Sequence, residues 1–208
     1  MIHIENNIYS TKRLPVTIIR NTPFSLSVIS FFLLLTLNVT QAMAKPRYNR
    51  TVEEYKIPDI TLINQDGERV PLVKYLDTEQ PVILEFIFAT CTTICPILSI
   101  GYTNLQDQLG AEAANLRLVS ISIDPEYDTP EVMKAYLQRY NAQPGWDFLT
   151  GSIGDINVAM RAFDAFVPDK MGHRPLIFLR SPKEKTWVRI DGLMSGKELK
   201  NEYLQLKK

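Results

Sequence analysis

The chain has 208 residues, of which 45% are hydrophobic and 22% are charged, a composition typical of globular proteins. Its 23 basic and 23 acidic side chains give a net charge of zero, so the charge balance offers no electrostatic support for nucleic-acid binding. The sequence shows no internal repeat, no low-complexity tract and no second domain boundary.

Residues 1–44 have the pattern of a secretory signal peptide. Basic residues precede an apolar core at positions 28–37, and the segment ends in the small-residue sequence Ala42-Met43-Ala44. An apolar core of this length is too short to span the ~30 Å hydrocarbon layer of a bilayer. We therefore predict a cleaved signal and a periplasmic protein. The weaker alternative is an uncleaved anchor that tethers the protein to the outer face of the cytoplasmic membrane.

The rest of the chain, residues 45–208, carries 20 basic and 22 acidic side chains, because three basic residues and one acidic residue precede position 45. Residues 45–56 are polar and charged, which predicts a tether. Residues 57–208 are numerous enough to form one domain with a sizeable core.

Hydrophobic patterning predicts alternating strands and helices along this domain. In chain order we first expect a hairpin over residues 59–72 with its turn at 65–67, a buried strand over 81–88 and a helix from 96 to about 110. A second buried strand over 116–123, a helix over 129–140, a short strand around 148 and a helix over 155–163 follow. The domain ends with a strand over 175–179, a strand over 187–191 that pairs back with it, and a closing helix over 195–206. This order predicts an α/β fold with a central mixed sheet flanked by helices and an N-terminal hairpin.

The two cysteines, Cys91 and Cys95, lie in the loop that follows the first buried strand. A disulfide between them would close only a five-residue loop, which stabilises a fold little. The residue before a proline disfavours the helical region, so Pro96 predicts Cys95 at the N-cap of the next helix and Cys91 in the preceding turn. A helix N-terminus stabilises thiolates, which are the reactive and metal-binding form of cysteine. The alternative is a pair of inert buried thiols.

His173 is the one histidine within residues 45–208, and it lies in the loop before the strand at 175–179. If that strand is the antiparallel neighbour of the strand over 81–88, His173 can lie beside the cysteine loop. Two thiolates and one imidazole suit copper, most clearly Cu+, whereas structural zinc sites take four ligands. The alternative is an exposed loop histidine that binds nothing.

Three features together resemble the Sco/SenC copper proteins of the respiratory chain: the sequence FIFATCTTICP at 86–96, the sequence SIDPEYDTPE at 122–131, and the late loop histidine His173. The resemblance implies a thioredoxin-like domain outside the cytoplasmic membrane that binds a copper ion, Cu+ or Cu2+, through Cys91, Cys95 and His173. It implies a role in maturing the dinuclear copper centre of cytochrome c oxidase, as metal donor, as reductant of the cysteines of that site, or as both. The implied partner is the copper-bearing oxidase subunit or another periplasmic copper or thiol protein.

Three residues depart from that family's pattern. Thr92 replaces a proline that often follows the first cysteine, and Arg174 follows the histidine, where it would add positive charge near the thiolates. Glu85 interrupts an apolar strand six residues before Cys91, the position of the buried acid of thioredoxins. Burial would raise the pKa of Glu85 and allow it to carry a proton to the dithiol. The alternative is a glutamate at a poorly covered position of the sheet.

Acidic residues also follow the second buried strand. Asp124 could accept a hydrogen bond from His173 or act as a base near the thiols, but we favour a role in the turn at Pro125. We expect Asp128 and Glu131 to support the N-terminus of the next helix.

The rival to a copper chaperone is a metal-independent, exported thiol-disulfide oxidoreductase, in which Cys91 attacks and Cys95 resolves through a reversible disulfide. A requirement for His173 separates the two functions, because dithiol exchange needs no imidazole ligand. A peroxidase is disfavoured, because Phe88 occupies the position of the threonine that peroxiredoxins place three residues before their reactive cysteine.

Overall fold

The computed structural model describes residues 47–182 and 184–207. The predicted signal peptide or anchor, residues 1–44, lies outside the described residues. Within the described ranges, no helix has both the length and the hydrophobicity needed to cross a membrane.

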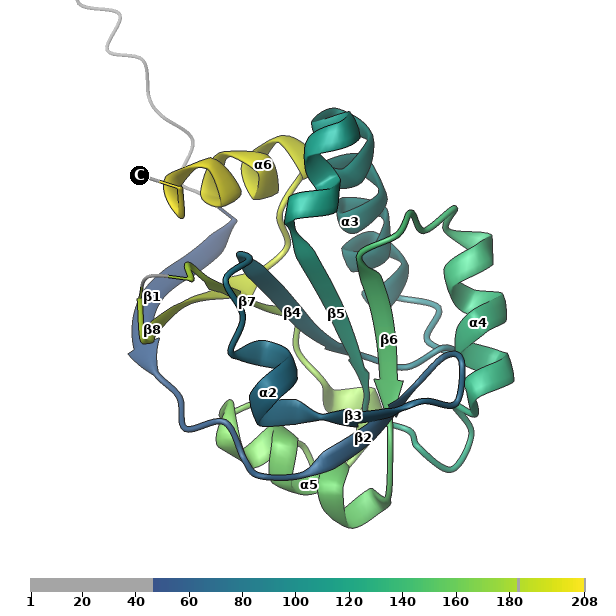
Figure 1. The fold of residues 1–208 in the computed structure, drawn as a ribbon. Coiled ribbons are helices and arrows are strands. Elements are labelled where there is room, and N and C mark those ends of the chain that lie inside the picture. Colours follow the sequence, from purple (N-terminus) through teal and green to yellow (C-terminus); the bar gives the residue numbers. More distant parts are fainter. Residues whose placement is uncertain (1–46, 183, 208) are drawn as a thin grey trace, which may run out of the picture. The chain divides into compact units, whose positions relative to one another are not determined.

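In the described part of the chain, eight strands form one mixed sheet with the order β1-β8-β7-β4-β5-β6-β2-β3 (Figure 1). Strands β4, β5 and β6 are mutually parallel, and the other neighbouring pairs are antiparallel. The strands are β1 (Tyr48–Glu54), β2 (Thr61–Asn64), β3 (Arg69–Pro71), β4 (Val82–Ile87), β5 (Arg117–Ser122), β6 (Trp146–Thr150), β7 (Leu176–Arg180) and β8 (Thr186–Gly192). The predicted α/β class, mixed sheet and N-terminal hairpin are confirmed.

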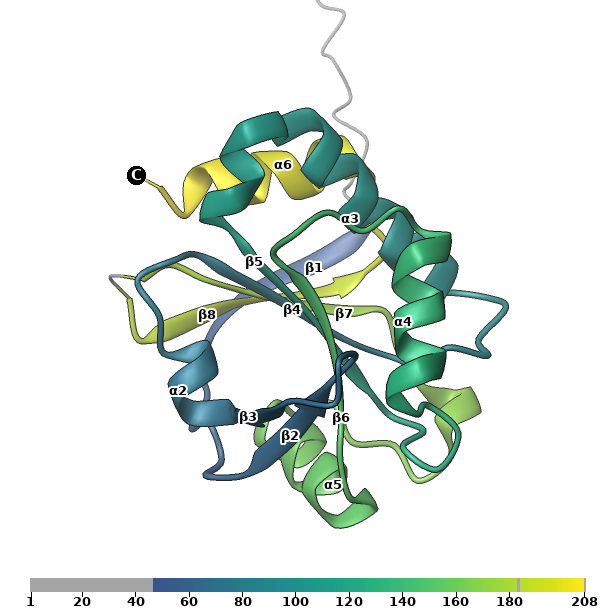
Figure 2. The ribbon, with the colours of Figure 1, turned by 45° about the vertical axis from the view of Figure 1, so that its right-hand side comes forward.

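Helices cover both faces of this sheet. Helices α3 and α6 pack together on one side, and α5 lies on the opposite side (Figures 1 and 2). The helices are α2 (Leu72–Leu76), α3 (Cys95–Leu109), α4 (Pro130–Arg139), α5 (Ile153–Ala162) and α6 (Gly196–Gln205), with 3-10 turns η2 (Gly110–Asn115) and η3 (Lys170–Gly172).

Local sequence signals explain where the helices begin. The Thr129 side chain accepts a hydrogen bond from the Val132 N–H, and Pro130 occupies the first turn of α4, as predicted. Ser195 and Glu198 form a reciprocal capping box at the start of α6. The first turns of these helices therefore have partners for backbone groups that the helix itself cannot satisfy.

The first strand differs from the sequence prediction. Residues 45–56 were expected to be a tether, but residues 48–54 form β1, which pairs with β8 along its whole length. Gly192 permits this approach, because a Cβ at that position would lie 2.7 Å from the Tyr48 Cα. Most side chains of β1 are exposed, so the strand lacks the apolar alternation that reveals a half-buried strand in sequence. The tether prediction was wrong for these residues.

An aromatic cluster fills the core on the α5 side of the sheet. Phe163, at the end of α5, is fully buried, and its ring centroid lies 5.1–5.9 Å from those of Tyr55, Phe86, Phe178 and Trp187. These contacts join β4, β7 and β8 to α5.

Replacing Phe163 with alanine should therefore lower the free energy of unfolding by about 3–5 kcal/mol, because it removes the central ring and leaves a cavity. Denaturant unfolding measures the loss. Tyr127→Ala, at a position that is 56% exposed, is the matched control and should change stability by less than about 1 kcal/mol. Equal losses in the two variants would contradict the assignment of Phe163 to the core.

Candidate metal centre

The order of three strands brings the candidate ligands together. Strand β4 lies between β5, which is parallel to it, and β7, which is antiparallel. The loop that leaves β4 and the loop that enters β7 therefore lie at the same edge of the sheet. Cys91 and Cys95 follow β4 and His173 precedes β7, and their ligand atoms all lie within 4.8 Å of one another. The predicted proximity of the three residues is confirmed.

The cysteine loop is a tight turn that leads into α3. The Cys91 N–H donates to the Phe88 carbonyl at 3.2 Å, and the Ile97 and Leu98 N–H groups donate to the Ile94 carbonyl. Ile94 is already helical and caps α3, so Cys95 is the first residue of the helix and not its N-cap, one position from the prediction.

At the start of α3, a backbone N–H group donates a hydrogen bond to the sulfur of Cys91. The Cys95 N–H, in the first turn of α3, has no acceptor within the helix and donates to Cys91 Sγ at 3.5 Å. The Thr93 hydroxyl lies 3.6 Å from the same sulfur. Both cysteines are free thiols; Cys91 is 8% exposed and Cys95 is fully buried.

The His173 ring is held by two different partners. Its Nδ1 lies 2.7 Å from the Lys170 carbonyl, which can only accept, so Nδ1 carries the proton. Its Nε2 then presents a lone pair to Cys95 Sγ, which lies 3.1 Å away. Phe88 packs edge-on against the imidazole with ring centroids 5.1 Å apart. The orientation of the ring therefore leaves Nε2 available as a ligand.

The two thiols differ in acidity. Burial opposes ionisation of Cys91, but hydrogen bonds from Cys95 and Thr93 outweigh it and lower the pKa of the Cys91 thiol. Burial, the hydrogen bond with Cys91 and the charges of Cys91 and Glu85 raise the pKa of Cys95 well above that of an ordinary thiol. Burial lowers the pKa of His173 and favours the neutral imidazole. Cys91 is therefore the more acidic thiol of the pair.

The donor set fits a soft metal ion. Two sulfurs and one imidazole nitrogen are donors that favour copper, and a structural zinc site would need a fourth protein ligand. Among the described residues, Cys91, Cys95 and His173 are the group of His, Cys, Asp and Glu side chains close enough together to share one ion.

Glu85 is fully buried in β4, so the alternative of a poorly covered position is wrong. The Ser120 hydroxyl donates to its Oε1 at 2.8 Å, and its Oε2 has no partner. Burial raises the pKa of Glu85 to about 8, although the bond from Ser120 opposes the shift. The predicted rise in pKa is confirmed, whereas proton transfer to the dithiol stays a prediction.

Two further sequence predictions have different outcomes in the structure. Asp124 bonds the turn at Pro125, as favoured, but through its backbone carbonyl, which accepts from the Tyr127 and Asp128 N–H groups at 3.0 and 2.9 Å. Its carboxylate pairs with Lys170 Nζ at 2.5 Å and not with His173. Arg174 pairs with Asp191 of β8, so a carboxylate balances the charge that was expected near the thiolates.

Asp128 is the residue near the site whose role the sequence prediction missed. It was expected to support the next helix, but it is fully buried, and its carboxylate accepts hydrogen bonds from the Ser122 hydroxyl at 2.6 Å and from the Ala89 N–H at 3.2 Å. Burial raises the pKa of Asp128 to about 6, and these bonds oppose the rise. Asp128 therefore ties the end of β5 to the start of the cysteine loop. No local sequence signal distinguishes this role from helix capping.

Comparison with known proteins shows that the chain is similar to SCO1/SenC proteins. A family model described as SCO1/SenC matches residues 49–206. The SCO1 protein homolog of Bacillus subtilis (strain 168) is 34% identical over 147 residues, which cover 67% of this chain and 75% of the relative.

Solved structures show the same likeness. The structure of BsSco, described as a member of the Sco family of cytochrome c oxidase assembly proteins with a disulfide switch, has a TM-score of 0.62 and 30% identity, and the match covers 75% of this chain and 95% of that one. ScoI of Arabidopsis thaliana, solved with copper bound, has a TM-score of 0.59 and 27% identity, covering 71% and 94% of the two chains. The predicted thioredoxin-like fold is confirmed.

The unequal acidity and exposure of the thiols predict unequal reactivity. In the reduced, metal-free protein at neutral pH, iodoacetamide should label Cys91 before Cys95, because the attacking form is the thiolate and Cys95 is both buried and mainly protonated. Peptide mass spectrometry over a time course measures both rates, and Cys95→Ser provides the rate of Cys91 alone. Equal labelling of the two thiols would contradict the assignment.

The raised pKa of Glu85 predicts a pH-dependent stability. The native state favours the neutral acid up to about pH 8, whereas the unfolded chain ionises near 4.5, so the stability linked to Glu85 is present below pH 4.5 and is lost as the pH rises through about 8. Between these values the unfolding free energy of Glu85→Gln should rise relative to wild type by an amount on the order of 5 kcal/mol.

Urea unfolding at several pH values measures this difference, and Glu79→Gln, at an exposed position, controls for the loss of a carboxylate elsewhere. Subtracting the wild-type curve removes the contributions of Asp128 and His173, which both variants retain. A difference that stays constant with pH would show that Glu85 is ionised in the native protein at neutral pH.

Proposed function

Because the chain belongs to the SCO1/SenC family, we propose that it is a copper-binding protein that acts in the assembly of cytochrome c oxidase. One observation supports copper binding above the others: two thiols and the lone-pair nitrogen of an imidazole lie within 4.8 Å of one another at one edge of the sheet. The relative from Arabidopsis thaliana whose structure contains copper has the same fold.

The ligands would be Cys91 Sγ, Cys95 Sγ and His173 Nε2. Copper binding would replace the proton of Cys95, which lies 3.1 Å from Nε2, so the metal would take the place of an existing hydrogen bond. The Lys170 carbonyl would keep the ring in the tautomer that binds through Nε2. The three soft donors favour Cu+ over Cu2+.

The two thiols also support a reductive role toward the copper-site cysteines of the oxidase. The Cys91 thiolate would attack a disulfide of the client protein, and Cys95 would then attack the mixed disulfide. The client leaves as a dithiol, and this chain keeps the new Cys91–Cys95 disulfide, so two electrons pass to the client. The lowered pKa of Cys91 favours the first step, and Cys91 is the more exposed of the two cysteines, at 8% against 0% for Cys95.

We further propose that the protein acts outside the cytoplasmic membrane, since residues 1–44 have the pattern of a signal peptide. The client would be the copper-bearing oxidase subunit. The second candidate function is a metal-independent thiol-disulfide oxidoreductase, which the difference in acidity between Cys91 and Cys95 favours and which gives His173 no task.

Replacement of each ligand tests the metal site, and replacement of His173 separates the two functions, because dithiol exchange needs no imidazole. Cys91→Ser, Cys95→Ser and His173→Ala should each lower Cu+ affinity by more than the ~10–100-fold typical of changes to residues behind a metal ligand, because each removes a direct donor. Competition with a chromophoric Cu+ chelator measures affinity, and thermal unfolding of the metal-free variants tests that the fold is retained.

Thr92→Ala, an exposed change within the same loop, is the matched control and should leave affinity unchanged. If His173→Ala binds Cu+ as tightly as wild type, the three-ligand site is wrong. If wild type binds no copper but reduces a model disulfide, the second candidate function is correct.

A further inference from the structure

One short segment contacts both loops of the metal centre. Residues 122–128, here named the bracket, leave the end of β5 and turn toward α4. The backbone of the bracket is closed by hydrogen bonds from the Tyr127 and Asp128 N–H groups to the Asp124 carbonyl, at 3.0 and 2.9 Å. Its two aspartates contact different loops: Asp128 contacts the cysteine loop, and Asp124 contacts the histidine loop.

The first contact fixes the cysteine loop. Asp128 is buried and accepts from the Ala89 N–H, two residues before Cys91, and from the Ser122 hydroxyl. The same Ser122 oxygen accepts from the Asp124 N–H at 3.0 Å. The backbone of Asp124 is therefore held by the same network that holds the start of the cysteine loop.

The second contact fixes the histidine loop. Asp124 Oδ2 pairs with Lys170 Nζ at 2.5 Å, and the carboxylate side chain is 13% exposed. Lys170 begins η3, and its carbonyl accepts the Nδ1 proton of His173. Lys170 thus binds Asp124 of the bracket with its side chain and the His173 imidazole with its backbone carbonyl.

The Lys170 side chain crosses the end of β4 to reach its partner. Lys170 lies in the loop that enters β7, Asp124 follows β5, and β4 lies between these strands. Along this path Nζ lies 5.4 Å from the centroid of the Phe88 ring, which also packs against His173. The ammonium therefore has a carboxylate on one side and an aromatic face on another.

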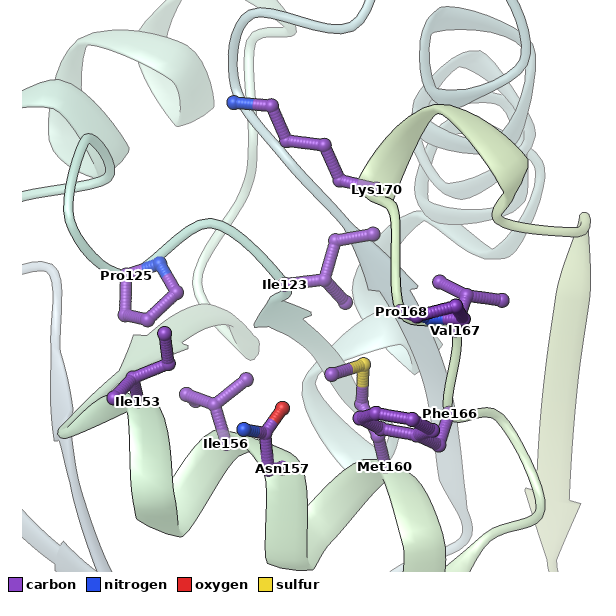
Figure 3. Close-up of a pocket in the computed structure, with 10 residues that line it drawn as sticks. All are labelled: Ile123, Pro125, Ile153, Ile156, Asn157, Met160, Phe166, Val167, Pro168 and Lys170. Carbon is purple, nitrogen blue, oxygen red and sulfur yellow. The ribbon is translucent and has the colours of Figure 1, made fainter.

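The histidine loop borders a cavity on the α5 side of the sheet. A cavity of about 180 Å³ lies there, lined mainly by apolar residues of α5 and of the segment before η3 (Figure 3). Lys170 lies at its edge, and its ammonium points away from Met160 and Phe166 (Figure 3). The ion pair is a direct link between this loop and the segment that follows β5.

We propose that the Asp124–Lys170 ion pair positions His173, holding its Nε2 at Cys95 so that the three ligands are arranged before metal arrives. Lys170 is a positioning residue and contacts no metal. The proposal rests on the proposed copper function only for its affinity test. Loss of the pair would lower the fraction of molecules in which His173 faces the cysteines, and metal affinity would fall by the same factor.

The test uses the full chain with Lys170→Met, which keeps an unbranched apolar side chain without the charge, and with Asp124→Asn, which keeps the size of the acid. Both should lower Cu+ affinity by ~10–100-fold, the range found for residues that orient a metal ligand. Lys170→Arg should restore most of the affinity. Lys134→Met, which breaks the exposed Lys134–Asp66 pair, is the matched control and should change nothing.

Two readouts separate positioning from a general structural effect. In the His173→Ala background Lys170→Met should cause no further loss of affinity, because there is no imidazole left to position. In the metal-free protein, diethyl pyrocarbonate should modify His173 faster in Lys170→Met than in wild type, because Nε2 leaves the shelter of Cys95; peptide mass spectrometry measures this rate.

Unchanged affinity in both variants, or an equal loss with and without His173, would overturn the proposal. If wild type binds no copper, the proposed function fails, and the modification rate of His173 then decides the positioning role alone: a faster rate in Lys170→Met supports it, and an unchanged rate overturns it.

Discussion

The antiparallel pairing of β7 with β4 is the constraint on which the candidate metal centre depends. Since β5 runs parallel to β4, the carboxyl ends of β4 and β5 and the amino end of β7 meet at one edge of the sheet. Cys95 and His173 are 78 residues apart in the sequence, yet the two cysteines and the histidine become neighbours at this edge. A parallel β7 would place the histidine at the opposite edge, and the same residues would form no site.

Buried carboxyl groups lie beneath this edge, and they have two different tasks. Glu85 is fully buried in β4, where burial raises its pKa to about 8, and its charge raises the pKa of Cys95. Asp128 accepts hydrogen bonds from the ends of both central strands and fixes the loop that carries Cys91. The interior of the sheet therefore influences the thiols through charge in one case and through geometry in the other.

Sequence reasoning predicted the parts of the structure that local pattern controls. The buried strand β4, the cysteine turn and the capped start of α4 all follow from apolar runs, proline and hydrogen-bonding caps. It missed β1, whose exposed side chains carry no period and whose pairing depends on β8. It also missed the contact of Asp124 with Lys170, because an ion pair between residues 46 positions apart depends on tertiary approach and leaves no mark on local sequence.

The free thiols of the candidate site link two properties that are usually controlled separately. Cys91 and Cys95 are two of the three candidate donors, and they are also the pair predicted to form a reversible disulfide. Oxidation would leave His173 as the single remaining ligand, so the capacity to carry metal would follow the redox poise of the surroundings. For a two-electron couple, a change of about 30 mV alters the ratio of dithiol to disulfide tenfold. The reduction potential of a compartment could thus decide whether this protein binds copper, with no change in copper concentration.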